Sequence, residues 1–130
     1  MASDLSKAEH WRDFILSRCR YPAINRLQAQ FVSATIHDSC QCGCNSFALI
    51  HQADSLPPPI AEVGRGGMVF EADFHPPDEK TLEILLFTDG SGRLSYVEID
   101  CLGNNFPVPD IIEINDEPFE VRASDKLLPS

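Results

Sequence analysis

Near the start of the chain, apolar residues recur every three or four positions, which is the spacing of one face of a helix. These residues are Leu5, Ala8, Trp11, Phe14, Ile15 and Cys19. Pro22 ends this helix, because its ring disfavours the helical conformation at Tyr21, and it is well suited to begin a second, short helix. In that second segment Ile24, Leu27 and Phe31 share one side. The pattern therefore predicts two helices in the first quarter of the chain.

Beyond Phe31 the apolar period shortens from about 3.6 to 2 and β-branched residues become frequent, as is typical of strands. Two strand-like segments lie between residues 32 and 52, and three more, MVFEADF, TLEILLF and RLSYVEIDCL, follow a segment with three consecutive prolines. Proline cannot donate to a strand ladder, so we expect that proline segment to be a loop. Between the last two strands, Asp89-Gly90 and Gly92 are expected to supply the positive φ angles of a short hairpin turn.

Helices followed by strands predict an α+β domain, in which N-terminal helices pack on one face of an antiparallel β-sheet meander. A chain of this length fits a single domain over residues 1–130. Within it we expect helices over about 1–31, sheet over 32–114 with a short edge strand at 111–114, and an irregular tail over 115–130. The sheet face without helices is then exposed to solvent or to a partner.

The charge balance narrows the choice of partner. Twenty acidic residues against ten basic ones give a net charge of −10, which repels nucleic acid and attracts a basic protein or a cation. The N-terminal segment lacks the apolar run of a signal peptide, and no stretch approaches the ~20 apolar residues of a membrane-spanning helix. We therefore expect a cytoplasmic protein whose five cysteines are thiols or metal ligands rather than disulfides.

Three cysteines alternate in the segment SCQCGCNSF, so Cys40, Cys42 and Cys44 share one face if the segment is extended. Together with Cys101, at the end of a later strand, they would form a tetrahedral thiolate site for zinc. The spacing argues against this site, because zinc knuckles place two to four residues between paired cysteines. A bulge at Gly43 would nevertheless turn two of the sulfurs toward one metal ion. Small buried hydrophobic side chains are the preferred interpretation. A catalytic thiol is disfavoured, because the segment offers few groups that lower a thiol pKa.

Carboxylates form the second group of candidate residues. Strand alternation predicts that acidic side chains and one tyrosine lie opposite the apolar residues of their strands: Glu71, Asp73, Tyr96, Glu98 and Asp100. If these strands share a sheet, its exposed face carries a cluster of negative charge that is either simply hydrated or attracts a basic partner. Acid–base catalysis by two of these carboxylates is disfavoured, since nothing in the sequence indicates a desolvated pocket.

Three motifs follow one another in an order that resembles a family of small, uncharacterised bacterial proteins. They are a P-x-x-x-x-L-x-x-Q helix at Pro22, Leu27 and Gln30, the CQCGC segment, and the hairpin ILLFTDGSGRLSYVEI, followed by a proline-containing tail. The family has a CxCGC segment ahead of an LLF-x(n)-G-x-LS-x-VE hairpin. The resemblance implies the α+β fold class and a bacterial origin, and it brings no known activity.

Together these features favour a non-enzymatic, protein-binding domain that needs no cofactor. Its expected partner is a basic protein that meets the acidic sheet face, and neither nucleic acid nor a membrane is expected to bind. Some small acidic bacterial proteins are immunity proteins that inhibit toxins, and the analogy of size and charge suggests an immunity-like inhibitor. The alternatives are the zinc-binding protein and a homodimer joined through an edge strand or the uncovered sheet face. An enzyme would need a pocket that combines one of these cysteines or carboxylates with a histidine.

Overall fold

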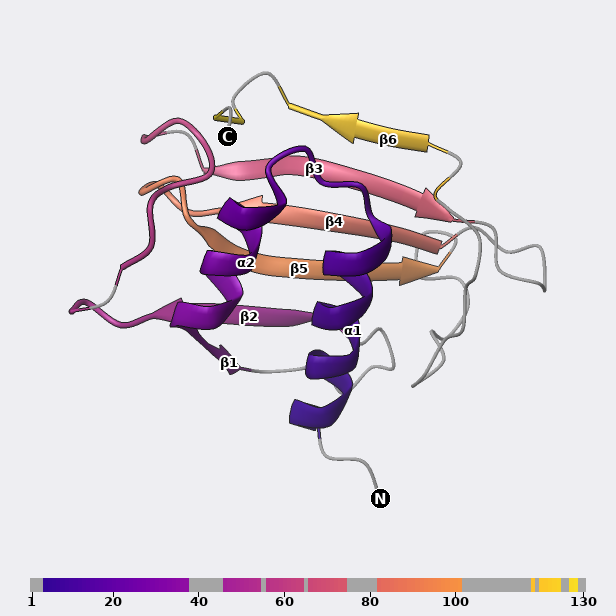
Figure 1. The fold of residues 1–130 in the computed structure, drawn as a ribbon, viewed down its shortest axis with the longest axis horizontal. Helices are drawn as coiled ribbons and strands as arrows, with labels where there is room; N and C mark the ends of the chain where they lie inside the picture. Colours follow the sequence, from indigo (N-terminus) through magenta and orange to yellow (C-terminus); the bar gives the residue numbers. More distant parts are fainter. Residues whose placement is uncertain are drawn as a thin grey trace.

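The computed structural model describes residues 4–37, 46–54, 56–64, 66–74, 82–101, 118, 120–124, 127 and 128. Within these residues two helices precede six strands (Figure 1): α1 (Asp4–Arg18), α2 (Ile24–Ser33), β1 (Ala34–His37), β2 (Phe47–His51), β3 (Gly67–Phe74), β4 (Leu82–Thr88), β5 (Leu94–Cys101) and β6 (Glu120–Ala123). The predicted α+β class, with helices first, is therefore confirmed. In the described part of the chain, no helix is long and apolar enough to cross a membrane.

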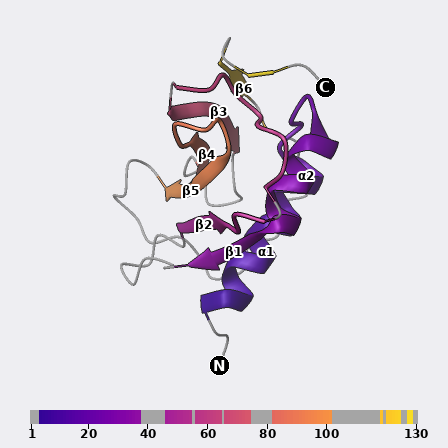
Figure 2. The same ribbon diagram turned by 90° about the vertical axis from the view of Figure 1, so that its left-hand side faces the viewer.

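The strands form one antiparallel sheet in the order β1-β2-β5-β4-β3-β6. The predicted meander holds for β3, β4 and β5. The hairpin of β1 and β2 joins it on the other side of β5, so β2 pairs with β5 rather than with β3. Figure 2 shows that both helices cover the same face of this sheet. Neither described helix lies on the opposite face.

The hydrophobic core lies between the helices and the sheet. Leu82, Ile84 and Leu86 of β4 are fully buried, and the residues between them are only partly buried, as the predicted alternation requires. Ring contacts join the two layers: Phe14 of α1 lies 5.1 Å from Phe74 of β3, measured between ring centroids, in an edge-to-face arrangement. Such contacts add to the burial energy of the rings and fix α1 over β3.

Strand β6 lies in the segment that the sequence analysis expected to be an irregular tail, so that expectation is wrong at this point. Its four residues are all exposed, and the strand forms only because it pairs with the outer side of β3. A short, exposed strand has no apolar alternation, and its partner is distant in sequence, so local pattern could not indicate it. The predicted edge strand at 111–114 lies outside the described residues.

The triproline segment, residues 57–59, runs beside α2 and the start of β5. As expected, it joins no ladder, because proline has no N–H to donate. Each of its three carbonyl oxygens accepts a side-chain hydrogen bond instead. The donors are Arg93 Nε to Pro57 (2.7 Å), Gln30 Nε2 to Pro58 (2.6 Å) and Arg26 Nη1 to Pro59 (3.2 Å). These bonds attach the segment to both α2 and β5.

Gln30 also holds the first residue of β5. Its side chain is fully buried, and its Oε1 accepts the backbone N–H of Leu94 at 2.9 Å. The carbonyl of Leu94 accepts a hydrogen bond from Nε2 of His51 at 2.7 Å, which assigns the ring proton to that nitrogen. Among the described residues, only Phe47 and Ala48 of β2 pair with β5. Side chains therefore replace strand partners where this ladder ends.

We expect Gln30→Leu to lower the free energy of unfolding by about 2 kcal/mol, because it leaves the buried Leu94 N–H without a partner and removes the hydrogen bond to the Pro58 carbonyl. Chemical denaturation measures this difference. Gln28→Leu is the matched control, since Gln28 is exposed on the same helix, and it should change stability by less than about 0.5 kcal/mol. Equal stabilities of the two variants would show that the Gln30 bonds contribute nothing net.

Gly92 allows the β4–β5 turn to approach the triproline loop closely. Its φ is 78°, and its carbonyl accepts the N–H groups of Ile60 (2.8 Å) and Ala61 (3.1 Å). A Cβ built at this position would overlap the carbonyl oxygen of Ala61. The predicted positive φ is confirmed at Gly92 and is wrong at Gly90, whose φ is not positive. One glycine of this turn is therefore required by the fold and the other is not.

Gly92→Ala should lower the free energy of unfolding by about 3 kcal/mol or more, because both the backbone conformation and the space exclude a side chain. Gly90→Ala is the control in the same turn, since a Cβ there meets no atom within 4 Å. It should shift stability by less than about 0.5 kcal/mol. Thermal unfolding of both variants tests the close approach, and comparable losses would contradict it.

Candidate functional site

The strand register gathers acidic and aromatic side chains on the sheet face that the helices do not cover. Asp73 of β3 pairs with Glu83 of β4, Leu85 of β4 pairs with both Glu71 and Glu98, and Phe87 of β4 pairs with Tyr96 of β5. We call this surface the acidic face; its described side chains are Glu71, Asp73, Glu83, Leu85, Phe87, Tyr96 and Glu98. Three adjacent strands therefore bring together residues that are up to 27 positions apart in the chain.

The remaining predicted site residues are placed only in part. Asp100 and Cys101 belong to β5, where they pair with Glu83 and Leu82, but their side chains lie outside the described part of the structure. Cys40, Cys42 and Cys44 lie wholly outside it. The zinc site therefore stays a prediction. The fifth cysteine, Cys19, is buried in the core, where loss of solvent raises the pKa of its thiol and keeps it protonated.

Burial on the acidic face differs between strands. Tyr96 and Glu98 are partly exposed, as an outward face requires, but Glu71 and Asp73 are only 7% and 5% exposed. The expectation that these two carboxylates are fully hydrated is therefore wrong. Strand β3 lies between β4 and β6, so side chains of both neighbours flank them, including Arg122 of β6 opposite Glu71. Desolvated carboxylates are uncommon and need compensation.

Three carboxylates meet on β3 and β4, and we call them the carboxylate cluster: Glu71, Asp73 and Glu83. One oxygen of each lies within 4.8 Å of the oxygens of the other two. The sequence analysis missed Glu83. Its alternation with the buried Leu82 and Ile84 was the available signal, but only the pairing of Asp73 with Glu83 shows that the two carboxylates are neighbours.

The electrostatics of the cluster disfavour full ionisation. The pKa of Asp73 is raised to about 7, first by burial, then by a hydrogen bond with Glu71 and by the negative charges of Glu71 and Glu83. Arg122 opposes this rise, with Nη1 lying 3.5 Å from Glu71 Oε2, but its Nη2 also binds Glu120 at 2.8 Å. A hydrogen bond between two carboxyl groups requires a proton on one of them. The cluster is therefore a place for a proton or another cation.

An aromatic pair lies beside the carboxylates on the acidic face. The rings of Phe87 and Tyr96 contact edge to face, with 6.1 Å between their centroids. Met68, which pairs with Phe87, is 46% exposed, and Ile50, two residues from the partner of Tyr96 in β2, is 54% exposed. Partly exposed apolar side chains next to carboxylates are typical of protein-binding surfaces.

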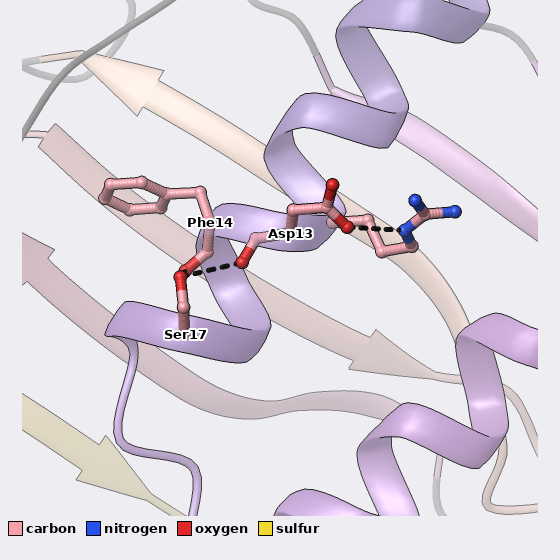
Figure 3. Close-up of polar contacts among 4 residues, drawn as sticks. Asp13, Phe14 and Ser17 are labelled. Atoms are coloured by element: carbon pink, nitrogen blue, oxygen red, sulfur yellow. Dashed lines mark hydrogen bonds and ion pairs between the residues drawn. The ribbon is translucent and has the colours of Figure 1, made fainter.

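A hollow lies between the helices, on the other side of the molecule from the acidic face. It encloses about 220 Å³ and is lined by Arg12, Asp13, Leu16, Gln28, Phe31 and Val32. Figure 3 shows polar contacts within α1 beside this hollow: Ser17 donates to the carbonyl of Asp13 at 2.8 Å, and the Asp13 carboxylate binds Arg12 Nε at 3.1 Å. An exposed ion pair between chain neighbours contributes little. The acidic face is the stronger candidate.

Comparison of the chain with protein-family models, with curated proteins and with solved structures finds no match. The resemblance to the bacterial CxCGC family therefore stays a prediction, and function has to be argued from the acidic face.

Asp73→Asn should raise the free energy of unfolding by about 1 kcal/mol at neutral pH in buffer with a chelator, because the amide keeps the shape and removes a buried negative charge. The melting temperature would then rise by about 4 °C. Asp54→Asn is the control, since Asp54 is exposed. A loss of stability at Asp73 alone would mean that its carboxylate makes net favourable contacts.

Proposed function

We propose that this protein is a binding domain that docks a basic protein on its acidic face. The observation that supports this most directly is the gathering of four carboxylates and an aromatic pair on the sheet face opposite both helices. Aromatic side chains are enriched in protein interfaces relative to the rest of the surface. Here Phe87 and Tyr96 remain partly exposed among charged neighbours.

Charge supports the choice of partner. The net charge of −10 extends an attractive field for cationic groups beyond the surface, and the described carboxylates of β3, β4 and β5 bring part of that charge to one face. Such a field speeds the encounter with a basic partner and disfavours acidic ones. Lysine and arginine side chains are therefore the groups that we expect opposite Glu98.

The layout of the face supports docking by a protein rather than by isolated ions. Interfaces place aromatic anchors at the centre, where water is excluded, and charged groups toward the rim. The pair of Phe87 and Tyr96 supplies such a centre, Met68 extends it, and Glu98 lies beside it, diagonal to Phe87 across β4 and β5. We expect Tyr96 to supply affinity and Glu98 to supply charge selection.

The specific form of the proposal is an immunity-like inhibitor, a small acidic domain that covers the basic surface of an enzyme or toxin. The argument for it is the match of size and charge. A cytoplasmic location and a bacterial source belong to the same proposal. The buried free thiol of Cys19 is compatible with such a reducing compartment.

Affinity capture on the immobilised protein tests the proposal. From an extract of source cells we expect a basic protein to bind at about 50 mM NaCl and to elute by about 500 mM, since salt screens exposed charges. Tyr96→Ala and Glu98→Lys should each reduce its retention at least about tenfold. Glu9→Lys is the matched charge reversal, since Glu9 is exposed on α1, and it should retain the partner.

Three results would contradict the proposal. They are retention that is insensitive to salt, equal losses in Glu98→Lys and Glu9→Lys, and a homodimer of this chain that Tyr96→Ala dissociates. The last result would assign the face to self-association. Light scattering of the purified protein and the variant distinguishes it from capture of a foreign partner.

A further inference from the structure

The carboxylate cluster is fixed by the sheet and not by flexible loops. Asp73 and Glu83 lie directly opposite each other in the β3–β4 ladder, and Glu71 is the next residue on the same face of β3. Directly paired strand residues have Cβ atoms about 5 Å apart, and like charges in such pairs destabilise the sheet. The backbone therefore holds three negative groups close together, in a place where two of them are also buried.

The positive charge that β6 brings to the cluster is shared with another carboxylate. Arg122 lies 3.5 Å from Glu71, and it forms its shorter contact, 2.8 Å, with Glu120. One guanidinium is thus shared between the cluster and a fourth carboxylate. It is also 60% exposed, so water weakens its attraction.

A second observation points to a ligand independently of the charge count. Oδ1 of Asp73 is buried, and it receives no hydrogen bond from the described residues. A buried carboxylate oxygen without a donor is costly, and native structures nearly always supply a partner for such an atom. Because the Asp73 carboxylate lies within 4.8 Å of the other two, a group bound between them would satisfy it.

We propose that Glu71, Asp73 and Glu83 bind a divalent cation, and that this cation is Ca²⁺. Carboxylate oxygens are hard ligands and suit Ca²⁺ or Mg²⁺ rather than zinc. Oxygens on opposite sides of one Ca²⁺ are about 4.6 to 5.2 Å apart, since each Ca–O distance is about 2.3 to 2.6 Å. All three oxygens of the cluster lie within this span. Mg²⁺ requires a more contracted site, with at most about 4.2 Å across the ion.

Ca²⁺ takes six to eight oxygen ligands, so three carboxylates leave positions for water. Glu83 is partly exposed, which gives solvent and the ion a route to the buried pair. Arg122 can turn wholly to Glu120, which it already contacts, when the ion replaces it at Glu71. With only three protein side chains as ligands, we expect a dissociation constant of about 0.1 to 1 mM. This site goes beyond the proposed docking function and does not depend on it.

Isothermal titration of the metal-free protein with CaCl2, up to about 10 mM, tests the site. We expect one ion per chain, a melting temperature that rises with CaCl2, and weaker binding of MgCl2. Glu83→Gln and Asp73→Asn should each weaken Ca²⁺ binding at least about tenfold, as expected for loss of a ligand. Glu98→Gln is the control, since Glu98 lies on the same face but outside the cluster, and it should bind Ca²⁺ like the parent protein.

The proposal is wrong if CaCl2 has no effect beyond NaCl of equal ionic strength, or if Glu98→Gln weakens binding as much as Glu83→Gln does. The second outcome would indicate diffuse attraction to an acidic surface. Glu83 is the least buried of the three ligands, so Glu83→Gln decides the question even if Asp73→Asn does not fold. Partner capture with a chelator present is a separate readout, so failure of one proposal leaves the other open to its own test.

Discussion

The buried amide of Gln30 is the contact on which the arrangement of this protein most depends. It joins three parts of the chain that are distant in sequence, because its nitrogen binds the Pro58 carbonyl and its oxygen binds the Leu94 N–H. Helix α2 is thereby attached both to the triproline segment and to β5, and water cannot replace the bond to the buried Leu94 N–H if it is lost. This attachment holds the helix layer on one face of the sheet. The polar and aromatic side chains of the opposite face are therefore not covered by these helices.

The buried carboxylates of the acidic face disfavour folding, so their presence points to a role other than stability. Glu71 and Asp73 are buried beside Glu83, although apolar residues at these positions would fold more readily. Proteins retain unfavourable polar groups where binding requires them. The docking proposal uses the exposed part of the face around Tyr96 and Glu98, and the cation proposal uses the buried part. Leu85 of β4 lies between the two parts, since it pairs with Glu71 of β3 on one side and with Glu98 of β5 on the other.

Local pattern was sufficient for the two helices, for strands β1 to β5 and for their faces. The change of period from 3.6 to 2 located the helices and the strands β3 to β5, and alternation placed Glu71 and Asp73 opposite the apolar core. Features that depend on strand pairing could not be predicted. The burial of Asp73, its contact with Glu83 and the existence of β6 all follow from which strands are neighbours, and a single sequence does not show this. The two hydrogen bonds of Gln30 could not be predicted either, since its partners are 28 and 64 positions away in the chain.

Side-chain NMR of the labelled protein, with and without its captured basic partner, tests the central claim that the acidic face is the functional surface. Our account predicts that the ring signals of Phe87 and Tyr96 shift on binding. The indole signal of Trp11, a residue of α1 that is buried in the core, should stay in place. Shifts confined to Trp11 and to residues of the hollow between α1 and α2, with the Tyr96 ring unchanged, would contradict the account and move the binding surface to the helices.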